Sequence, residues 1–277
     1  MKTTQLILFL LIILFFTSCS TTFFQVYDVK SKGDLTYDSD SLIFEDENCK
    51  IIYNMWSNGG NIGFVFFNKT DQFITIKLDE SFFVLNGFAY DYYLSREKTD
   101  TNFNSFSRSE RYNFSVAEMF VNLGGNTQIN KDNNSSMSSL KMTAGSSTSF
   151  KEKSEITIPP KTNKIIDEYK ISNKLIRDCE LERFPTKRNI NTLSYDSENS
   201  PVQFSNLITY EIDGVKVEVA NEFYVSDVTN YPVSLFYDKK QEEICGKKTN
   251  RFFNDLKEYA PDKFYLEYEK KGSKSKY

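Results

Sequence analysis

Short apolar segments separated by turn residues dominate the first third of this chain. The segments are 49–56, 61–68, 73–78, 81–85 and 88–94. Between them lie Asn58-Gly59-Gly60 and Asn86-Gly87, and both residue types tolerate the positive φ that a tight hairpin requires. Closely spaced turn signals of this kind are typical of a β-sandwich. We therefore expect a mainly β chain, folded as an antiparallel, immunoglobulin-like β-sandwich.

The alternation of apolar and polar residues supports this fold class. Ile74, Ile76 and Leu78 fall on one face of an extended chain, whereas Thr75 and Lys77 fall on the other. A half-buried antiparallel strand has this period of two. Further strands are predicted at 23–27, 156–158, 165–171, 202–212, 215–225 and 264–268, and Asp213-Gly214 is predicted to form the turn between the strands at 202–212 and 215–225.

A polar insertion, residues 96–153, interrupts the strand pattern. Ser115 and Glu118 form a capping box, which predicts a short helix. The apolar residues of this helix share one face: Val116, Met119, Phe120 and Leu123. That face packs either on its own domain or on a partner. Residues 126–149, of which 14 of 24 are Ser, Thr or Asn, are predicted to be flexible.

A second short helix is predicted near the C-terminus, from Arg251 to Tyr259. The spacing of Phe252, Leu256 and Tyr259 places them on one helical face, and Pro261 ends the helix. We expect this helix to pack on the sandwich together with the last strand.

The N-terminus has the pattern of a bacterial secretion signal. Lys2 precedes an uninterrupted apolar run from Leu6 to Phe16, and Cys19 follows shortly after it. The run is too short to cross a membrane, which takes about 20 residues. A cysteine at the cleavage point predicts that residues 1–18 are removed and that lipidated Cys19 becomes the first residue.

The segment from Phe16 to Cys19 resembles a lipobox, with small residues just before the cysteine. It departs from that pattern at Phe16, where most such boxes carry leucine. Cleavage before Ser18 or Ser20 by ordinary signal peptidase is one alternative, and a buried core helix is another.

The composition restricts the chemistry available to this chain. It contains no histidine, which excludes Ser-His-Asp and Cys-His catalysis as usually built and removes the commonest zinc ligand. Its net charge is −4 and it has no basic stripe, so nucleic acid is not an expected partner. We predict no catalytic residue, no cofactor and no bound metal.

Three cysteines remain after Cys19, and none of them forms a Cys-x-x-Cys pair. Cys49 lies in an apolar strand-like segment, whereas Cys179 and Cys245 lie in polar stretches. An oxidising envelope permits a disulfide between Cys179 and Cys245. Three unpaired thiols are the alternative.

Several clusters have both a structural and a functional interpretation. The densest carboxylates, Glu45-Asp46-Glu47 and Glu242-Glu243, are either solvated loop charges or parts of a hydrolytic site. Such a site needs two carboxylates facing each other across a cleft, which neighbours in sequence do not show.

Other candidates are oxygen ligands and aromatic rings. Asp38 and Asp40 are either part of an ordinary turn or the seed of a calcium site. Trp56 either packs in the core or stacks on a sugar. The aromatic cluster of Tyr90, Tyr92 and Tyr93 either lines a binding face or is covered by its own sandwich.

Two stretches resemble predicted lipoproteins of Bacteroidetes that have no assigned activity. They are residues 61–68 (NIGFVFFN) continuing through 81–87 (SFFVLNG), and residues 221–226 (NEFYVS) with 230–232 (NYP). The resemblance covers most of the chain, including the polar insertion. It implies a lipid-anchored position in the bacterial cell envelope and supplies no catalytic residues.

The resemblance also bears on the cellular location of the protein and on its glycosylation. Residues 20–22 lack the acidic cluster associated with surface export in this phylum, which favours an outer-membrane anchor that faces the periplasm. Asp40-Ser41-Leu42 resembles the short motif for O-glycosylation of exported proteins, which makes Ser41 a possible acceptor. An ordinary turn is the alternative.

The sequence thus predicts four parts and leaves two function classes open. The parts are a signal peptide (1–18), a tether with a first strand (19–41), the sandwich with its insertion (42–240), and a C-terminal helix and strand (241–277). The first function is a non-catalytic binding or scaffolding module that is tethered through lipidated Cys19 and binds an envelope protein or glycan. The second is a histidine-free hydrolase that uses carboxylates to cleave glycans.

Overall fold

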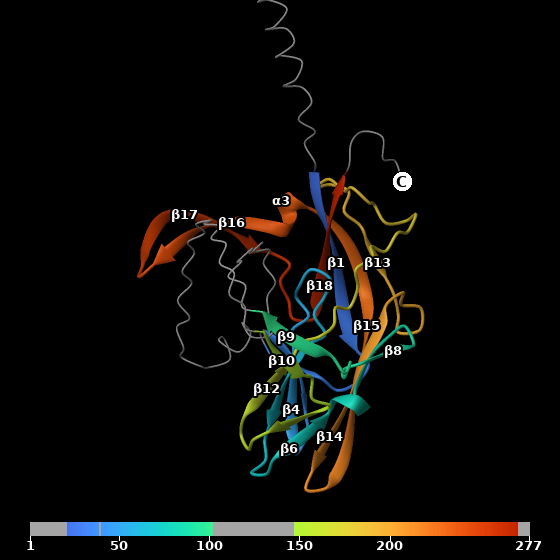
Figure 1. Ribbon diagram of the computed structural model, residues 1–277. Coiled ribbons are helices and arrows are strands. Elements are labelled where there is room, and N and C mark those ends of the chain that lie inside the picture. The colour runs from blue at the N-terminus through green and yellow to red at the C-terminus, as the bar shows by residue number, and fades with distance from the viewer. Residues whose placement is uncertain (1–20, 39, 102–146, 271–277) are drawn as a thin grey trace, which may run out of the picture.

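The computed structural model describes residues 21–38, 40–101 and 147–270. All strand pairs between named strands in these ranges are antiparallel, and two sheets enclose a common core (Figure 1). The predicted mainly β, sandwich-type fold is therefore confirmed. The large sheet runs in the order β11-β6-β14-β15-β1-β18, with β13 beside β15 and the β7–β8 hairpin beside β14.

The strands of the large sheet are β1 (Thr21–Ser31), β6 (Ile74–Lys77), β7 (Phe82–Leu85), β8 (Phe88–Asp91), β11 (Glu155–Ile158), β13 (Thr192–Ser194), β14 (Gln203–Ile212), β15 (Val215–Pro232) and β18 (Lys263–Lys270). The second sheet, in the order β12-β5-β4-β3-β2, contains β2 (Thr36–Asp38), β3 (Ser41–Glu45), β4 (Cys49–Tyr53), β5 (Phe64–Asn68) and β12 (Asn163–Ile166).

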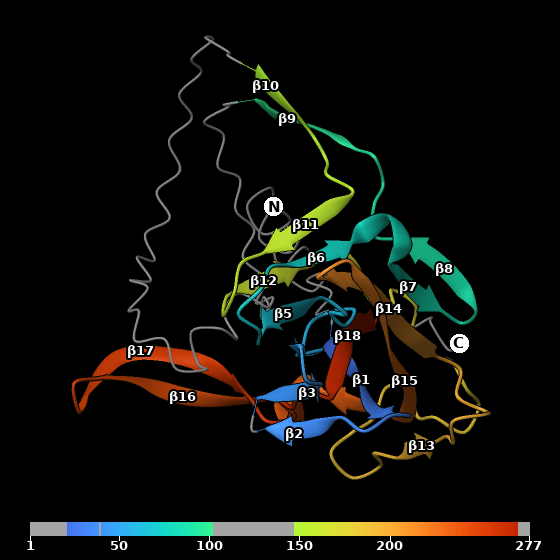
Figure 2. The ribbon, with the colours of Figure 1, turned by 90° about the horizontal axis from the view of Figure 1, so that it is seen from below.

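Two further hairpins lie outside these sheets (Figure 2). They pair β9 (Glu97–Thr101) with β10 (Ser147–Lys151), and β16 (Tyr237–Ile244) with β17 (Lys247–Leu256). Among the described residues, the helical segments are the 3₁₀ turn η1 (Leu78–Glu80) and the four-residue α3 (Val233–Phe236). In the described part of the chain, no helix is long and apolar enough to cross a membrane.

The main core fills the space between the two sheets. The predicted alternation in β6 is confirmed, because Ile74 and Ile76 are fully buried whereas Thr75 and Lys77 are partly exposed. Aromatic side chains from both sheets meet in this core, as Tyr53 of β4 and Phe223 of β15 do, with ring centroids 5.4 Å apart. Their burial stabilises the contact between the sheets.

Strand β1 occupies a central position in the large sheet, between β15 and β18. Its residues are buried on both faces: Tyr27 and Val29 join the main core, and Phe24 and Val26 join a smaller one. A strand buried on both faces carries no polar side, which explains why the residues at 23–27 are apolar or aromatic except for Gln25, whose amide is hydrogen-bonded. The first strand predicted within 19–41 is therefore present, although it extends beyond 23–27 and runs from Thr21 to Ser31.

Two predicted tight turns are confirmed. Asn86-Gly87 joins β7 to β8, and Asp213-Gly214 joins β14 to β15. Both residues of each turn have positive φ, at +48° and +83° for the first pair and +51° and +76° for the second. Two-residue loops with this geometry are type I′ turns, which match the twist of the flanking strands.

The connection between β4 and β5 differs from the expected hairpin. The two strands do pair, with Tyr53 opposite Phe64, but residues 54–63 form a long loop between them. This loop is almost entirely buried, and its backbone bonds to other segments: Met55 N–H donates to Pro261, and Gly59 N–H donates to Tyr265. A side chain at Gly60 would collide with Ile171 and Phe264, so only glycine fits there.

The predicted C-terminal helix is also wrong. Residues 251–256 belong to strand β17, which pairs with β16 through the turn Cys245-Gly246. Leu256 and Tyr259, two members of the expected helical face, pack against the smaller core that includes Trp56. The helix predicted at 115–123 and most of the Ser/Thr/Asn-rich stretch lie outside the described residues.

Candidate functional site

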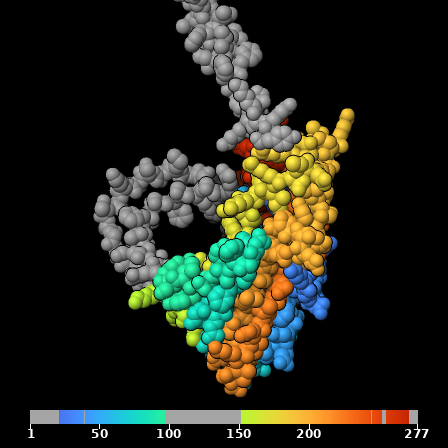
Figure 3. Space-filling view, turned by 90° about the vertical axis from the view of Figure 1, so that its right-hand side faces the viewer, coloured from blue at the N-terminus to red at the C-terminus, as the bar shows by residue number. Residues whose placement is uncertain are grey.

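A groove of about 700 Å³ opens between the β7–β8 hairpin and the segment 169–176. Figure 3 shows the teal surface of this hairpin meeting yellow residues of that segment. Six of the lining residues carry its chemistry: Phe83, Leu85, Tyr90, Tyr169, Lys170 and Lys174. A concave site of this size, with aromatic walls and a few polar groups, is typical of ligand binding.

Three stacked rings form one wall of the groove. Phe83 lies 5.4 Å from Tyr169 and 6.0 Å from Tyr90, centroid to centroid, with interplanar angles of 24° and 29°. Phe83 is buried in the core, whereas Tyr90 is 44% exposed. The buried ring therefore supports an exposed one, which is available to stack on a ligand.

Alternate side chains of the β7–β8 hairpin extend this apolar surface. Phe83 faces Tyr90 and Leu85 faces Phe88 across the hairpin, so the four side chains share one face. Phe88 is 71% exposed. The groove therefore continues into an exposed apolar shelf formed by Leu85, Phe88 and Tyr90.

The opposite wall is fixed by the buried loop 54–63. Ile171 N–H donates to the carbonyl of Gly60 (3.1 Å), and Ser172 N–H donates to that of Gly59 (2.9 Å). Ile171 is fully buried, which anchors the segment further. The buried loop 54–63 thus holds the segment 169–176, one side of the groove, in place.

The electrostatics of the groove contrast with those of the whole chain. None of its fourteen lining residues is Asp or Glu, although the protein has a net charge of −4. Lys170 and Lys174 line it, and neither forms an ion pair with a described residue. Burial raises the pKa of Tyr169, so its hydroxyl stays protonated and keeps its hydrogen bond to the carbonyl of Asp91.

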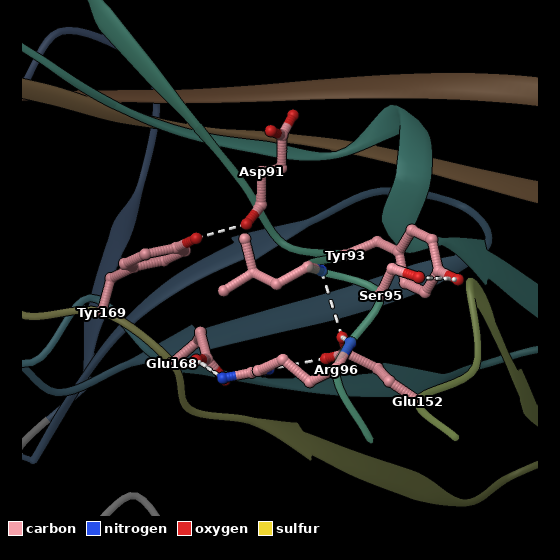
Figure 4. A network of polar contacts seen from close by, with 8 residues as sticks. Asp91, Tyr93, Ser95, Arg96, Glu152, Glu168 and Tyr169 are labelled. Carbon is pink, nitrogen blue, oxygen red and sulfur yellow. Dashed lines mark hydrogen bonds and ion pairs between the residues drawn. The ribbon is translucent and has the colours of Figure 1, made fainter. Parts of the chain in front are cut away.

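Beside the groove, Arg96, Glu152 and Glu168 form a charged cluster, which we call the clamp (Figure 4). It lies at the neck of the insertion, where the paired strands β9 and β10 leave the fold. Arg96 bonds through one guanidinium nitrogen to Glu152 (2.7 Å) and through both to Glu168. Glu152 also accepts the backbone N–H groups of Leu94 and Arg96. These bonds, with the Arg96 guanidinium first, lower the pKa of Glu152 to about 2. The adjacent Tyr169 donates its hydroxyl to the carbonyl of Asp91.

The aromatic cluster predicted at positions 90–93 is divided by the structure. Tyr90 lines the groove. Tyr92 is buried and donates its hydroxyl to Asn206 (2.6 Å), while Tyr93 packs partly buried against the core. Trp56 is 1% exposed and packs against Phe236, so of its two interpretations core packing holds.

The cysteine predictions meet a mixed outcome. Cys179 and Cys245 are both exposed and free, so the expected disulfide between them is absent and the alternative of unpaired thiols holds for the described cysteines. Cys179 lies in a loop beside β1, whereas Cys245 lies at the tip of the separate β16–β17 hairpin. Cys49 is buried in the core. Cys19 lies outside the described residues.

Ser41 does not fit the role of a glycan acceptor in the folded chain. It begins β3 with no exposed surface, and its hydroxyl has no hydrogen-bond partner in the structure. A glycan needs a solvent-accessible oxygen, so burial contradicts this prediction. The neighbouring acidic residues Asp38 and Asp40 belong to no group of three or more metal-binding side chains in the described ranges.

Two of the densest carboxylates, Glu45 and Asp46, take part in structural contacts. Glu45 pairs with Lys69 (2.7 Å), and Asp46 accepts the backbone N–H groups of Asn48 and Cys49. Glu242 and Glu243 lie on β16. Desolvation raises the pKa of three other carboxyls, none of which lines the groove: Asp28, Asp167 and Asp262.

Sequence reasoning found Tyr90 but missed Phe83 and Tyr169 as its supports. Phe83 was assigned to a strand, and its alternation with Leu85 carried the signal for a shared face. Tyr169 lies 86 positions further on, and no local pattern links the two. Comparisons with protein-family models, curated proteins and solved structures found no match to this chain.

Proposed function

We propose that this protein is a non-catalytic glycan-binding module of a bacterial cell envelope, tethered through lipidated Cys19. The observation that carries the binding function is the carboxylate-free aromatic groove. Hydrolysis of a glycan needs two carboxylates across a cleft, and the groove offers lysines, amides and rings instead.

The chemistry of the groove favours an acidic oligosaccharide. The exposed ring of Tyr90 provides a flat apolar face for a sugar ring, and the Asn173 side chain provides donors and an acceptor for hydroxyls. Lys170 and Lys174 add positive charge that attracts carboxylated sugars and weakens with added salt. The envelope address rests on the secretion signal, the lipobox-like segment and the resemblance to Bacteroidetes lipoproteins.

Calorimetric titration with an acidic and a neutral tetrasaccharide, a galacturonate and an N-acetylglucosamine oligomer, tests the binding function. We expect the acidic probe to bind more tightly, with affinity that falls as salt rises. Tyr90→Ala should weaken binding at least tenfold, while Tyr37→Ala, another exposed tyrosine outside the groove, should not. Binding of neither probe, or equal loss in both variants, would contradict the proposal.

The anchor has a separate test. Cys19→Ala should abolish incorporation of labelled fatty acid and release the protein from membranes. Label retained by this variant would refute lipidation at Cys19 without touching the groove.

The hydrolase remains the second candidate from the sequence, but no observation at the groove favours it. A second cavity, of about 840 Å³, is lined mainly by the loop 175–184 together with Tyr268 and Lys270. Its exposed acids Asp178, Glu180 and Glu182 lie within five residues of one loop rather than across a cleft. Release of reducing sugar from the acidic tetrasaccharide would revive this alternative.

A further inference from the structure

The point at which the chain enters the fold constrains the orientation of an anchored molecule at the membrane. Thr21 is the first residue of β1 and already pairs with Lys270 of β18. Two residues of extended chain span at most about 7 Å. If Cys19 is acylated, as the proposed function holds, this end of the large sheet must therefore lie at the membrane surface.

The surface at this end is cationic and aromatic. Phe184 lies against Phe23 and Tyr268, with ring centroids 5.3 and 6.1 Å away. Arg183 and Lys270 both lie over the Phe184 ring, at 4.9 and 5.2 Å.

Two further cations, Lys187 and Arg188, are exposed on the turn that follows Phe184. Neither these two nor Arg183 and Lys270 form an ion pair with a described residue, so no acid of the described ranges neutralises any of the four charges. Figure 1 shows yellow loop residues at the end of the molecule where β1 begins and β18 ends.

The loop that carries this surface is held firmly to the sheet. The buried Gln25 side chain donates to the carbonyl of Ile176 (2.9 Å), and buried Asn230 donates to that of Glu182 (2.9 Å). Tyr268 donates its hydroxyl to the carbonyl of Arg183. The cations are therefore presented at a fixed position relative to β1.

Acidic residues of the same loop are partly used internally. Asp178 accepts the backbone N–H of Glu180 (2.8 Å), and Glu182 accepts that of Phe184 (3.3 Å). Glu180 and Glu269 stay exposed. The segment from Arg183 to Arg188 itself contains three cations and no acid.

We propose that the rim formed by Arg183, Phe184, Lys187, Arg188 and Lys270 binds anionic lipid headgroups and fixes the orientation of the anchored domain. Basic residues near an anionic surface are attracted to it over about a Debye length. The β14–β15 turn, at the other end of the 18-residue β15, then points away from the membrane by roughly 55 Å.

The test uses the full acylated chain in vesicles that contain a headgroup-labelled quencher lipid and either neutral or anionic lipids. A fluorophore is placed on native Cys179, which lines the same cavity as Lys270, after Cys245→Ser. In the reference protein the fluorophore sits at the β14–β15 turn instead, on Val215→Cys, with Cys179→Ser and Cys245→Ser removing the other exposed thiols. We expect at least threefold stronger quenching at Cys179.

Inserting twenty Gly/Ser residues before Thr21 separates rim binding from mere proximity, because such a linker spans about 25 Å on average. Quenching at Cys179 should then persist on anionic vesicles only. It should be lost with Lys187→Glu/Arg188→Glu, and kept with the matched reversal Lys247→Glu/Lys248→Glu at the β16–β17 tip.

Two results would overturn the inference in a protein that floats with vesicles: equal quenching at both positions, or loss of quenching on linker insertion whatever the lipid. Failure to float because Cys19 carries no lipid would instead overturn the proposed anchor and this inference with it.

Discussion

Two hairpins in this molecule close in the same way but pack differently. β7–β8 turns at Asn86-Gly87, and β16–β17 turns at Cys245-Gly246, in each case with positive φ at both residues. β7 also pairs with β14, whereas in the described part of the chain β16–β17 pairs with no other strand. The comparison teaches that turn geometry makes a hairpin, and that a sheet partner decides whether it contributes to the core and to the site.

The largest expected effect lies in the packed hairpin. Phe83→Ala should reduce the free energy of unfolding by about 3–5 kcal/mol, because it empties a core position and removes the ring behind Tyr90. Urea unfolding followed by circular dichroism measures this loss. Phe83→Leu should retain much of the stability yet weaken oligosaccharide binding, since it keeps the volume but not the ring.

The projecting hairpin should behave in the opposite way. Replacing residues 240–253 by Asn-Gly shortens β16–β17 and keeps Lys239 opposite Asn254. We expect the unfolding free energy to change by less than about 0.5 kcal/mol, as for other surface changes. A loss comparable to that of Phe83→Ala would show that this hairpin is part of the cooperative fold.

The two turns themselves give a matched pair. Gly87 and Gly246 have φ of +83° and +75°, and neither would bring a Cβ within 4 Å of another atom. Only conformational strain remains, which costs about 1 kcal/mol for alanine. Gly87→Ala should show that loss in global unfolding. Gly246→Ala should not, because its hairpin can open alone; equal losses would contradict the distinction.

The fold was largely predictable where local rules apply. The alternation in β6 and the Asp213-Gly214 turn depend on neighbours in sequence, so the sequence revealed them. The 54–63 loop depends on bonds to Pro261, Tyr265 and Ile171, which no nearby residue signals. The β16–β17 hairpin was missed for a related reason, because Cys-Gly is a weaker turn signal than Asn-Gly and the helical spacing of Leu256 and Tyr259 competed with it.

The candidate site was predictable only in part. Tyr90 was suspected from its aromatic neighbours, but the groove requires the segment 169–176 to lie beside it. That arrangement follows from β12 pairing with β5 and from the bonds of Ile171 to the buried loop. Long-range packing of this kind has no signature in a single sequence.

The smallest effect concerns the clamp beside the packed hairpin. Since Arg96 lowers the pKa of Glu152 to about 2, the clamp stabilises the neck above the ordinary glutamate pKa of about 4.3 and loses that contribution as the pH falls toward 2. Protection of the Leu94 and Arg96 amides against hydrogen exchange should fall in this window. Glu152→Gln should remove the pH dependence, and protection that does not vary with pH would contradict the assignment.

The most direct test of the central claim is to map where the acidic tetrasaccharide contacts the protein, by NMR chemical-shift perturbation. The account predicts perturbations concentrated at Tyr90, Tyr169 and the segment 170–174, with the β16–β17 hairpin unchanged. Perturbations that avoid the groove, or that concentrate at the projecting hairpin, would contradict it.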